Sequence, residues 1–363
     1  MSLTPRAVTR GAAVPIASAD RRDRFTEKHR FLALLLLGGL LLPAGLAAVT
    51  AGSYDLSLGE VWSVLSANIL VLDSTGVDAV HQTIVWEIRL PRILVGILVG
   101  MALSGAGAVY QGCFRNPLVE PFILGVSAGG SLGAAVGILY PQLFLSTQFA
   151  AFISALIAVG LVYTLSRVDG SNPTVHLILA GVIIGSLFQA AVSVLKYLSD
   201  DAGLRAIVFW IMGGLYYAGW SDVAVLGPIV LAGVAVTWLL SWRLNVLSLG
   251  DVEARTLGVH PERLKLLFIV TATLMTAVSV ASVGIIAWVG LMTPHAARML
   301  FGPDHRYVIP AAALLGALYL LLCDTLARTL IGTEIPISIL TSILGAPYLF
   351  YLLRSRGRPA LTE

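Results

Sequence analysis

Few ionisable residues lie inside the apolar parts of this chain, so each of them is a candidate for chemistry. Asp324 sits within the run LYLLLCDTLARTL, and an acid at membrane depth suggests a proton relay because its burial is unfavourable. Arg328 follows four residues later, where the two side chains would meet on one helix face and neutralise each other. We favour this ion pair over the relay, since a relay usually contains several acids.

The spacing of the residues indicates neither a nucleotide-binding loop nor a metal site. A phosphate-binding loop of the form G-x-x-x-x-G-K-[ST] needs a lysine after glycine, whereas the lysines of this chain follow glutamate or leucine. The chain is therefore not a P-loop ATPase. His295 has no second histidine or cysteine at ligand spacing, and Cys113 and Cys323 lie far apart, so we expect neither a metal site nor a disulfide. No nucleophile is evidently paired with a base, which disfavours an intramembrane hydrolase.

The elements that must position these residues are long apolar segments. The chain has 363 residues, of which 57% are hydrophobic and 12% charged, and its mean hydropathy is +0.89. These values depart from those of a soluble domain and predict an all-α polytopic membrane protein. Clear apolar runs lie near residues 31–50, 92–114, 122–140, 145–165, 175–198, 222–242, 308–331 and 335–353.

The uncharged run between Lys265 and His295 decides the number of spans. A single helix there would place two basic segments on opposite sides of the membrane, against the bias of Lys and Arg toward the cytoplasm. Two helices with a turn near residues 279–284 place both segments inside, so the sequence predicts ten transmembrane helices with both termini cytoplasmic. Of the 23 Lys and Arg residues, this threading leaves outside only Arg89, Arg92, Lys196, Arg205 and Arg328.

The two ends of the chain are expected to be tails. Residues 1–30 are rich in Arg, Ala, Ser and Thr without apolar periodicity, which predicts a disordered cytoplasmic tail, and residues 357–363 form a short cytoplasmic C-terminal tail. A cleaved signal peptide is the alternative, but the apolar run that follows is long enough for a retained span. The net charge of +3 comes largely from the N-terminal tail and gives no indication of a nucleic-acid partner.

A polar interruption separates the second apolar run from the third, over QGCFRNPLVEPFILGVSAGGSLG at 111–133. Pro117 and Pro121 would end one helix and start the next on the cytoplasmic side. The small residues that follow either let helices pack closely or leave room for a passage, and their spacing favours neither interpretation. These small residues are Gly125, Ser127, Gly129, Gly130 and Ser131.

The coupling segment, as we name residues 243–265, is predicted to form a capped unit below the membrane. Ser248 and Asp251 make an S-x-x-D capping pattern, DVEARTL gives one to two helical turns, and Gly258 is a natural C-cap. Pro261 would then start a second short helix, PERLK. Such a helix–turn–helix is either a solvated connector or a unit that docks into the cleft of a partner.

Three of the outside arginines lie near the mouths of spans. Arg89 and Arg92 bracket Leu90-Pro91 at the start of one span, and Arg328 approaches the end of another. A cationic ring of this kind could steer and orient a soluble partner that carries acidic patches. Snorkelling of each arginine to the membrane interface is an equally good interpretation on the sequence alone.

Several segments, in the same order, resemble one protein family. The stretch RLPRILVGILVGMALSGAGAVYQGCFRNPLVEPFILGVSAGGSLGAAVG is similar to the signature of the FecCD family, the type II permeases of ATP-binding-cassette (ABC) importers for ferric siderophores, haem and cobalamin. The similarity continues in LSLGDVEARTLGV, GLMTPHAARMLFGPDHRYVIPAAALLGALYLLLCDTLAR and EIPISILTSILGAPYLFYLLR. It extends from about Tyr54 to Arg356.

The resemblance implies a permease domain over residues 31–356 that forms a homodimer in the cytoplasmic (inner) membrane of a prokaryote. It implies two cytoplasmic ATPase subunits, which hold ATP and Mg²⁺, and an extracytoplasmic binding protein. This chain would then be no enzyme and would bind no cofactor. The leading cargo is an iron chelate, a ferric siderophore. Haem, cobalamin or an oxyanion are alternatives on the same scaffold, and a proton-coupled secondary transporter using Asp324 is an alternative outside it.

The resemblance also implies contacts with the partner proteins. Arg89, Arg92 and Arg328 would pair with carboxylates of the binding protein. Part of the coupling segment would sit in clefts of the ATPase dimer. The residues implied for that contact are Leu249, Gly250, Asp251, Glu253, Ala254, Arg255, Leu257 and Gly258.

Two further segments would control the passage itself. The Gly- and Ser-rich helix start at 125–131 would flank the translocation pathway. The loop SNPTVHLILAG would close the pathway on the cytoplasmic side, although Pro173 stands where the family tends to have small polar residues. The gate residues are Asn172, Pro173, Thr174 and Val175.

Overall fold

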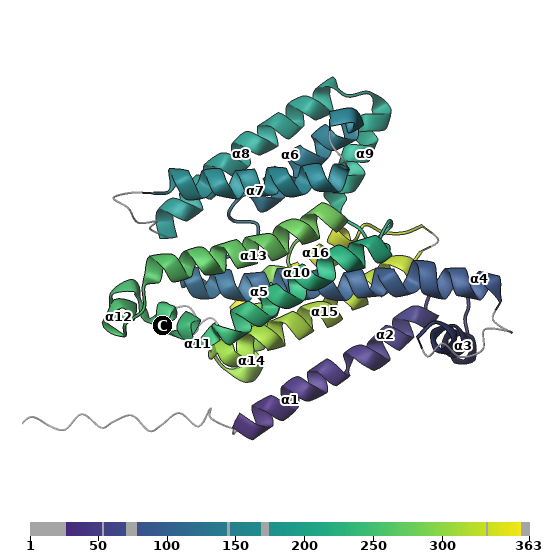
Figure 1. The fold of residues 1–363 in the computed structure, drawn as a ribbon, viewed down its shortest axis with the longest axis horizontal. Helices are drawn as coiled ribbons and strands as arrows, with labels where there is room; N and C mark the ends of the chain where they lie inside the picture. The colour runs from purple at the N-terminus through teal and green to yellow at the C-terminus, as the bar shows by residue number, and fades with distance from the viewer. Residues whose placement is uncertain are drawn as a thin grey trace, which may run out of the picture.

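The computed structural model describes residues 27–52, 54–69, 78–143, 146–167, 174–331 and 333–356, and the regular elements in these ranges are all helical (Figure 1). The expected tails lie outside the described residues except for 27–30, which belong to the first helix. The helices are α1 (Glu27–Gly39), α2 (Leu41–Thr50), α3 (Leu58–Ile69), α4 (Ala79–Gln82), the π-helix η1 (Thr83–Arg89), α5 (Leu90–Phe114), α6 (Val126–Leu139), the 3₁₀ turn η2 (Pro141–Leu143), α7 (Thr147–Leu165), α8 (Thr174–Leu198), α9 (Asp201–Met212), α10 (Trp220–Leu239), α11 (Ser241–Leu249), α12 (Asp251–Thr256), α13 (Pro261–Val283), α14 (Val289–Phe301), α15 (His305–Thr329) and α16 (Ile337–Arg356).

The all-α membrane fold is confirmed, because seven helical segments of the described chain are long and apolar enough to cross a bilayer. Three of the predicted spans are not among these seven: α6 and α14 are shorter helices, and the apolar part of α16 is only Ile337–Tyr351, so the count of ten spans and the orientation of the termini stay predictions. The predicted break between Lys265 and His295 is present. It lies slightly later than expected, since α13 runs to Val283 and Gly284 has φ +74°, which favours glycine.

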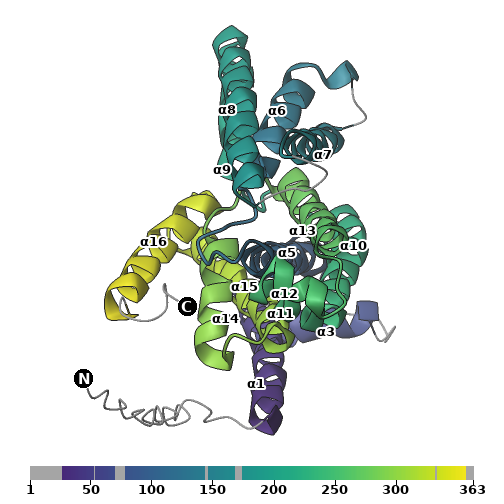
Figure 2. The ribbon, with the colours of Figure 1, turned by 90° about the vertical axis from the view of Figure 1, so that its left-hand side faces the viewer.

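Helix α5 lies at the centre of the bundle, and Figure 2 shows it among α10, α13, α14 and α15. Two glycines let its neighbours approach closely. A Cβ on Gly100 would lie 2.3 Å from the carbonyl oxygen of Gly316 in α15, and one on Gly107 would lie 1.9 Å from that of Gly290, next to the start of α14. Small residues at such contacts are typical of membrane helices, where close packing replaces the hydrophobic effect.

Helices α6, α7 and α8 form a layer on the far side of α13 from α5 (Figure 1). Glycine again permits the contacts within this layer, because a Cβ on Gly133 of α6 would lie 2.2 Å from the carbonyl oxygen of Ala150 in α7. Helix α16 stands apart from this layer, on another side of the bundle (Figure 2). Faces of both α8 and α16 are therefore uncovered within a single chain.

Candidate functional site

The coupling segment contains most of α11, the short helix α12 between two turns at glycine, and the start of α13. Gly250 precedes α12 with φ +139°, and Gly258 follows it with φ +78°. The amide of Val259 donates to the carbonyl of Ala254 at 2.9 Å, a C-terminal closure of the Schellman type. The predicted C-cap at Gly258 is therefore confirmed.

Two details of the predicted unit are wrong. Ser248 does not cap α12, because it lies within α11 and its hydroxyl donates to the carbonyl of Leu244 at 2.9 Å. The capping position belongs to Gly250. Pro261 does not start a separate short helix either, since it is the first residue of the long helix α13. The apolar residues after Lys265 simply continue the helix that PERLK begins.

Polar contacts tie the coupling segment to two long helices. The Nζ atom of Lys265 lies 2.7 Å from a carboxylate oxygen of Asp251, which joins α12 to α13. Asn245 of α11 donates to Asp304 at 2.7 Å and accepts from the amide of His305 at 2.9 Å, which joins α11 to the start of α15. The ion pair thus joins α12 directly to α13, and the contacts of Asn245 join the preceding helix α11 to α15.

Asp304 is the N-cap of α15, where its side chain accepts from the amide of Arg306. Burial alone would raise the pKa of Asp304, but hydrogen bonds from Arg306 and Asn245 hold that pKa below its ordinary value. The carboxylate thus stays charged at neutral pH. It anchors both the helix end and Asn245.

The residues implied for ATPase contact differ in exposure, and Glu253, Arg255 and Gly258 are exposed whereas Asp251 is partly buried. Gly250 and Ala254 are buried and shape the turn and the helix. Leu249 and Leu257 are exposed at 63% and 56%, and neighbouring Val252 is exposed at 71%. Exposed apolar side chains on a short polar unit are what a protein-binding surface requires. The sequence patterns did not single out Val252, although its exposure makes it the most prominent apolar side chain of α12.

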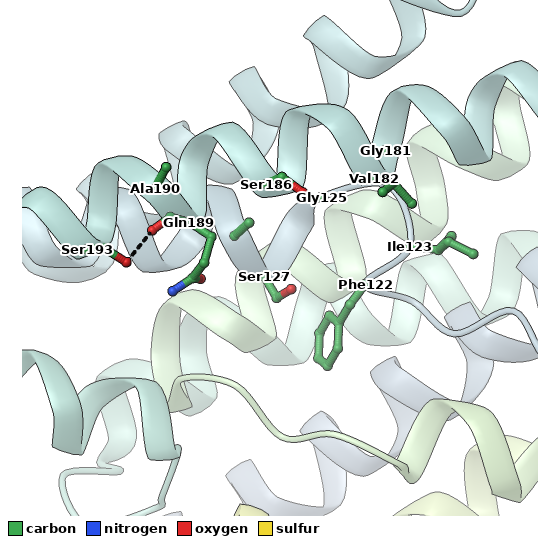
Figure 3. A pocket seen from close by; sticks show the side chains of 12 residues that line it. Phe122, Ile123, Gly125, Ser127, Gly181, Val182, Ser186, Gln189, Ala190 and Ser193 are labelled. Carbon is green, nitrogen blue, oxygen red and sulfur yellow. Dashed lines mark hydrogen bonds between the residues drawn. The ribbon is translucent and has the colours of Figure 1, made fainter.

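A cavity of ≈ 560 Å³ opens between the start of α6 and the middle of α8 (Figure 3). Gly125 and Ser127 contribute from α6 and its N-cap. The polar side chains on the α8 side come from Ser186, Gln189 and Ser193, whose spacing places them on one helix face. The Ser193 hydroxyl donates to the carbonyl of Gln189, whereas the Gln189 amide has no partner among the described residues. No charged residue lines this cavity.

The other residues expected along the pathway lie elsewhere. Gly129 packs on α7, where a Cβ would lie 2.7 Å from that of Ala158, and Gly130 faces Val280 of α13 at the same distance. Ser131 is buried, and its hydroxyl donates a hydrogen bond to the carbonyl of Ser127 at 2.8 Å. The start of the small-residue stretch thus lines the cavity and its continuation packs against helices, and its place along a translocation pathway stays a prediction.

The expected gate falls at the edge of the described chain. Asn172 and Pro173 lie outside the described residues. Thr174 and Val175 form the first turn of α8, and the Val175 side chain is exposed. Their closing role stays a prediction.

The three arginines expected at the outer mouth form one cluster with two acids. Asp324 accepts from Arg92 at 2.9 Å and from Arg328 at 3.1 Å through its two carboxylate oxygens. Arg92 also pairs with Glu334 at 2.9 Å, in the segment before α16. The predicted Asp324–Arg328 pair is confirmed. Because both oxygens of Asp324 are already occupied, a proton relay is not needed to explain this acid.

Backbone carbonyls in the last turn of α2 and just after it accept hydrogen bonds from Arg89 and Arg328. Arg89 donates to the carbonyls of Val49 at 2.7 Å, Thr50 at 3.0 Å and Tyr54 at 2.6 Å. Arg328 donates to Ala51 and Ala48 at 2.9 and 3.1 Å. A cation is favourable at the carbonyl end of a helix. All three arginines are buried in this structure, and their contact with a binding protein stays a prediction.

Comparisons with known proteins agree with this architecture. Residues 40–355 match the FecCD transport family. The chain is 40% identical to the cobalamin import permease BtuC of Halobacterium salinarum, over 92% of this chain and 90% of the relative, and 39% identical to the haemin transport permease HmuU of Yersinia pestis, over 90% and 96%. It also matches a solved inward-facing metal-chelate type ABC transporter with a TM-score of 0.78, at 37% identity over 90% of this chain and 99% of that one. The chain therefore belongs to the FecCD family of ABC importer permeases.

Proposed function

We propose that this chain forms the membrane passage of an importer for a bulky, weakly charged metal chelate, with a ferric siderophore as the leading cargo. The observation that carries the proposal is the cavity between α6 and α8, which is lined by glycine, serine, glutamine and apolar side chains, without a charged side chain. A bare ion would need charged groups or carbonyl rings to replace its hydration shell. A large chelate needs only distributed hydrogen bonds and van der Waals contacts along its route.

The energy for transport enters at the coupling segment. The exposed apolar side chains of α12 and its flanks would bury themselves in a cytoplasmic ATPase subunit that binds ATP and Mg²⁺. Closure of paired ATPases would shift α12, and the ion pair of Asp251 with Lys265 would pass that shift to α13. The contacts of Asn245 would pass it to α15. The bundle would then alternate between inward- and outward-facing packings.

The passage would be completed by a second copy of this chain. The cavity is lined by residues of α8, and both α8 and α16 carry exposed apolar side chains that a second copy could cover. The exposed apolar residues of these helices include Leu179 and Leu187 of α8 and Ile343 and Phe350 of α16. The homodimer would sit in the cytoplasmic membrane with both termini inside, because that threading keeps most basic residues on the cytoplasmic side.

Delivery of the cargo would involve a binding protein at the end of the molecule that carries the arginine cluster. Arg92 is the arginine best placed to exchange its carboxylate partner for one of the binding protein. Its partner Glu334 is 41% exposed, whereas its other partner Asp324 is 1% exposed. A carboxylate of the binding protein would have to displace Glu334 to reach Arg92. Docking would therefore depend on ionic strength through this exchange.

The test is a reconstitution of the chain with its ATPase and binding protein in liposomes, with a panel of ferric siderophore, haem and cobalamin. We expect ATP-dependent uptake of the siderophore and loss of ATPase stimulation in Arg255→Glu, which alters an exposed residue of α12. The matched control Arg205→Glu lies on α9 and should keep stimulation. Normal stimulation in Arg255→Glu would overturn the coupling role.

Cobalamin is the second candidate, because the permease from Halobacterium salinarum is named for it and is 40% identical. The same panel separates the two. Uptake of cobalamin without uptake of a ferric siderophore would reject the leading cargo and leave the uncharged passage and the ATP-driven mechanism intact.

A further inference from the structure

A pocket with a basic rim lies at the coupling segment, where α11 and the turn after α12 meet the start of α13, and neither the transport passage nor the arginine cluster includes it. Its volume is ≈ 410 Å³, and its walls combine apolar, aromatic and cationic side chains without an acid. The residues that define it are Trp242, Arg243, Leu257, His260, Arg263 and Leu267. A ligand with both an anionic and an apolar part would match these walls.

The positive charge of this pocket is not neutralised from within the chain. Arg243 and Arg263 are exposed, and neither has an ion pair or a hydrogen bond to any residue that the structure describes. Two nearby acids are engaged elsewhere. Asp251 pairs with Lys265, and Glu262 pairs with Arg255. Two free guanidinium groups facing one small pocket favour an anion that can accept from both, as a phosphate group does.

The apolar wall of the pocket continues along the surface of α13. Arg263, Leu267, Val270 and Leu274 follow one another at spacings of four, three and four residues, which places them on one helix face. The three apolar members are exposed at 43%, 47% and 37%. Figure 2 shows α13 and α10 side by side at an edge of the bundle away from α16. This stripe is therefore free to contact lipid acyl chains, with Arg263 at its end.

Residues at and beside the pocket are of the types that mark the boundary between hydrocarbon and water. Leu239 at the end of α10 is exposed at 77%, and Trp242 follows within one helical turn at 58% exposed. Tryptophan gathers at membrane interfaces because its ring is apolar and its N–H is polar. Arg243 follows directly, and the polar coupling segment lies beyond it. The pocket thus sits at headgroup depth, where basic pockets between membrane helices bind anionic lipids.

We propose that this pocket binds the phosphate headgroup of an anionic phospholipid, with Arg243 and Arg263 on the phosphate and an acyl chain along Leu267, Val270 and Leu274. The lipid would brace the turn that connects α12 to α13. This inference requires only that the helices span a bilayer and does not depend on the cargo or on the ATPase partner.

The experiment measures lipid binding to the purified full-length chain by native mass spectrometry, with phosphatidylglycerol and phosphatidylcholine as probes. We expect the wild type to prefer phosphatidylglycerol. In the double variant Arg243→Gln/Arg263→Gln, affinity for phosphatidylglycerol should fall roughly 30-fold, which corresponds to about 2 kcal/mol at 1.4 kcal/mol per tenfold change. Phosphatidylglycerol should also raise the melting temperature of the wild type more than that of the double variant.

The matched control is Lys196→Gln/Arg205→Gln, which removes two positive charges from α8 and α9 and should keep the lipid preference. Inorganic phosphate and glycerophosphoglycerol distinguish the lipid from a free phosphate compound, since neither should compete at millimolar concentration. The proposal would be overturned if the Arg243→Gln/Arg263→Gln variant bound phosphatidylglycerol with the same affinity as the wild type. Full competition by inorganic phosphate would overturn it as well. Retained lipid affinity with lost ATPase binding would instead assign the pocket to the ATPase surface.

Discussion

The two ends of the bundle hold their arginines in opposite ways. In the arginine cluster, the guanidinium groups of Arg89, Arg92 and Arg328 are buried and donate hydrogen bonds to carboxylates and to backbone carbonyls in and after the last turn of α2. At the end that carries α12, Arg243 and Arg263 are exposed without a partner among the described residues, and Arg255 has an exposed partner. The first arrangement joins helices of one chain. The second leaves charge available to other molecules.

This difference separates arginines that stabilise the fold from arginines that can bind. A buried guanidinium is tolerated only when its hydrogen bonds are satisfied, so removal of its acceptor is strongly destabilising. An exposed ion pair contributes little because water solvates both partners almost as well. The same type of residue should therefore have large effects on stability at one end and small effects on stability at the other.

The largest effect is expected for Asp324→Asn. This change leaves Arg92 and Arg328 buried without the carboxylate that they share, and should lower the free energy of unfolding by about 3–5 kcal/mol. SDS-induced unfolding in mixed micelles measures the loss. The control Glu87→Gln alters an exposed acid of η1 at the same end and should change little. A loss below about 1 kcal/mol for Asp324→Asn would show that the cluster does not hold the helices together.

A smaller effect is expected for Glu334→Gln. Arg92 keeps Asp324 in this variant, and the amide oxygen at position 334 can still accept a hydrogen bond. Because Glu334 is 41% exposed, its loss of charge should cost about 1 kcal/mol in the same unfolding assay. If a binding-protein carboxylate competes for Arg92, the variant should also bind that protein more tightly at low salt. Unchanged affinity at all ionic strengths would argue against the exchange.

The smallest effect on stability is expected for Arg255→Ala at the other end. Arg255 and Glu262 form an ion pair in which both side chains are exposed, at 60% and 42%. The free energy of unfolding should change by no more than about 0.5 kcal/mol. If Arg255→Ala lowered the free energy of unfolding as much as Asp324→Asn, the proposed difference between the two ends would be wrong.

The helices were predictable from the sequence, but several of their ends were not. Apolar runs and the inside bias of basic residues indicated the helices and the break between α13 and α14, because both follow from the thickness and chemistry of the bilayer. The S-x-x-D pattern misled because it is local. It could not show that α11 continues through Ser248, where the hydroxyl bonds back to Leu244.

The partners of the arginines could not be derived from spacing either, except where they are close in sequence. The Asp324–Arg328 pair was predictable because four residues separate its members. The carbonyls of α2 and the carboxylate of Glu334 are far from Arg89 and Arg92 along the chain, and only the packing of α2, α5 and α15 brings them together. The pocket at Arg243 and Arg263 depends in the same way on the approach of α11 to α13.

The central claim is that this chain provides a passage without its own energy source and is driven through α12 by a separate ATPase. The most direct measurement is cargo accumulation in liposomes that contain the purified chain, with and without the ATPase subunits, binding protein and ATP. We predict accumulation against a gradient only in the complete, ATP-supplied system, and no response to an imposed proton gradient. Uphill accumulation by the chain alone, driven by a proton gradient in the absence of nucleotide, would contradict the account.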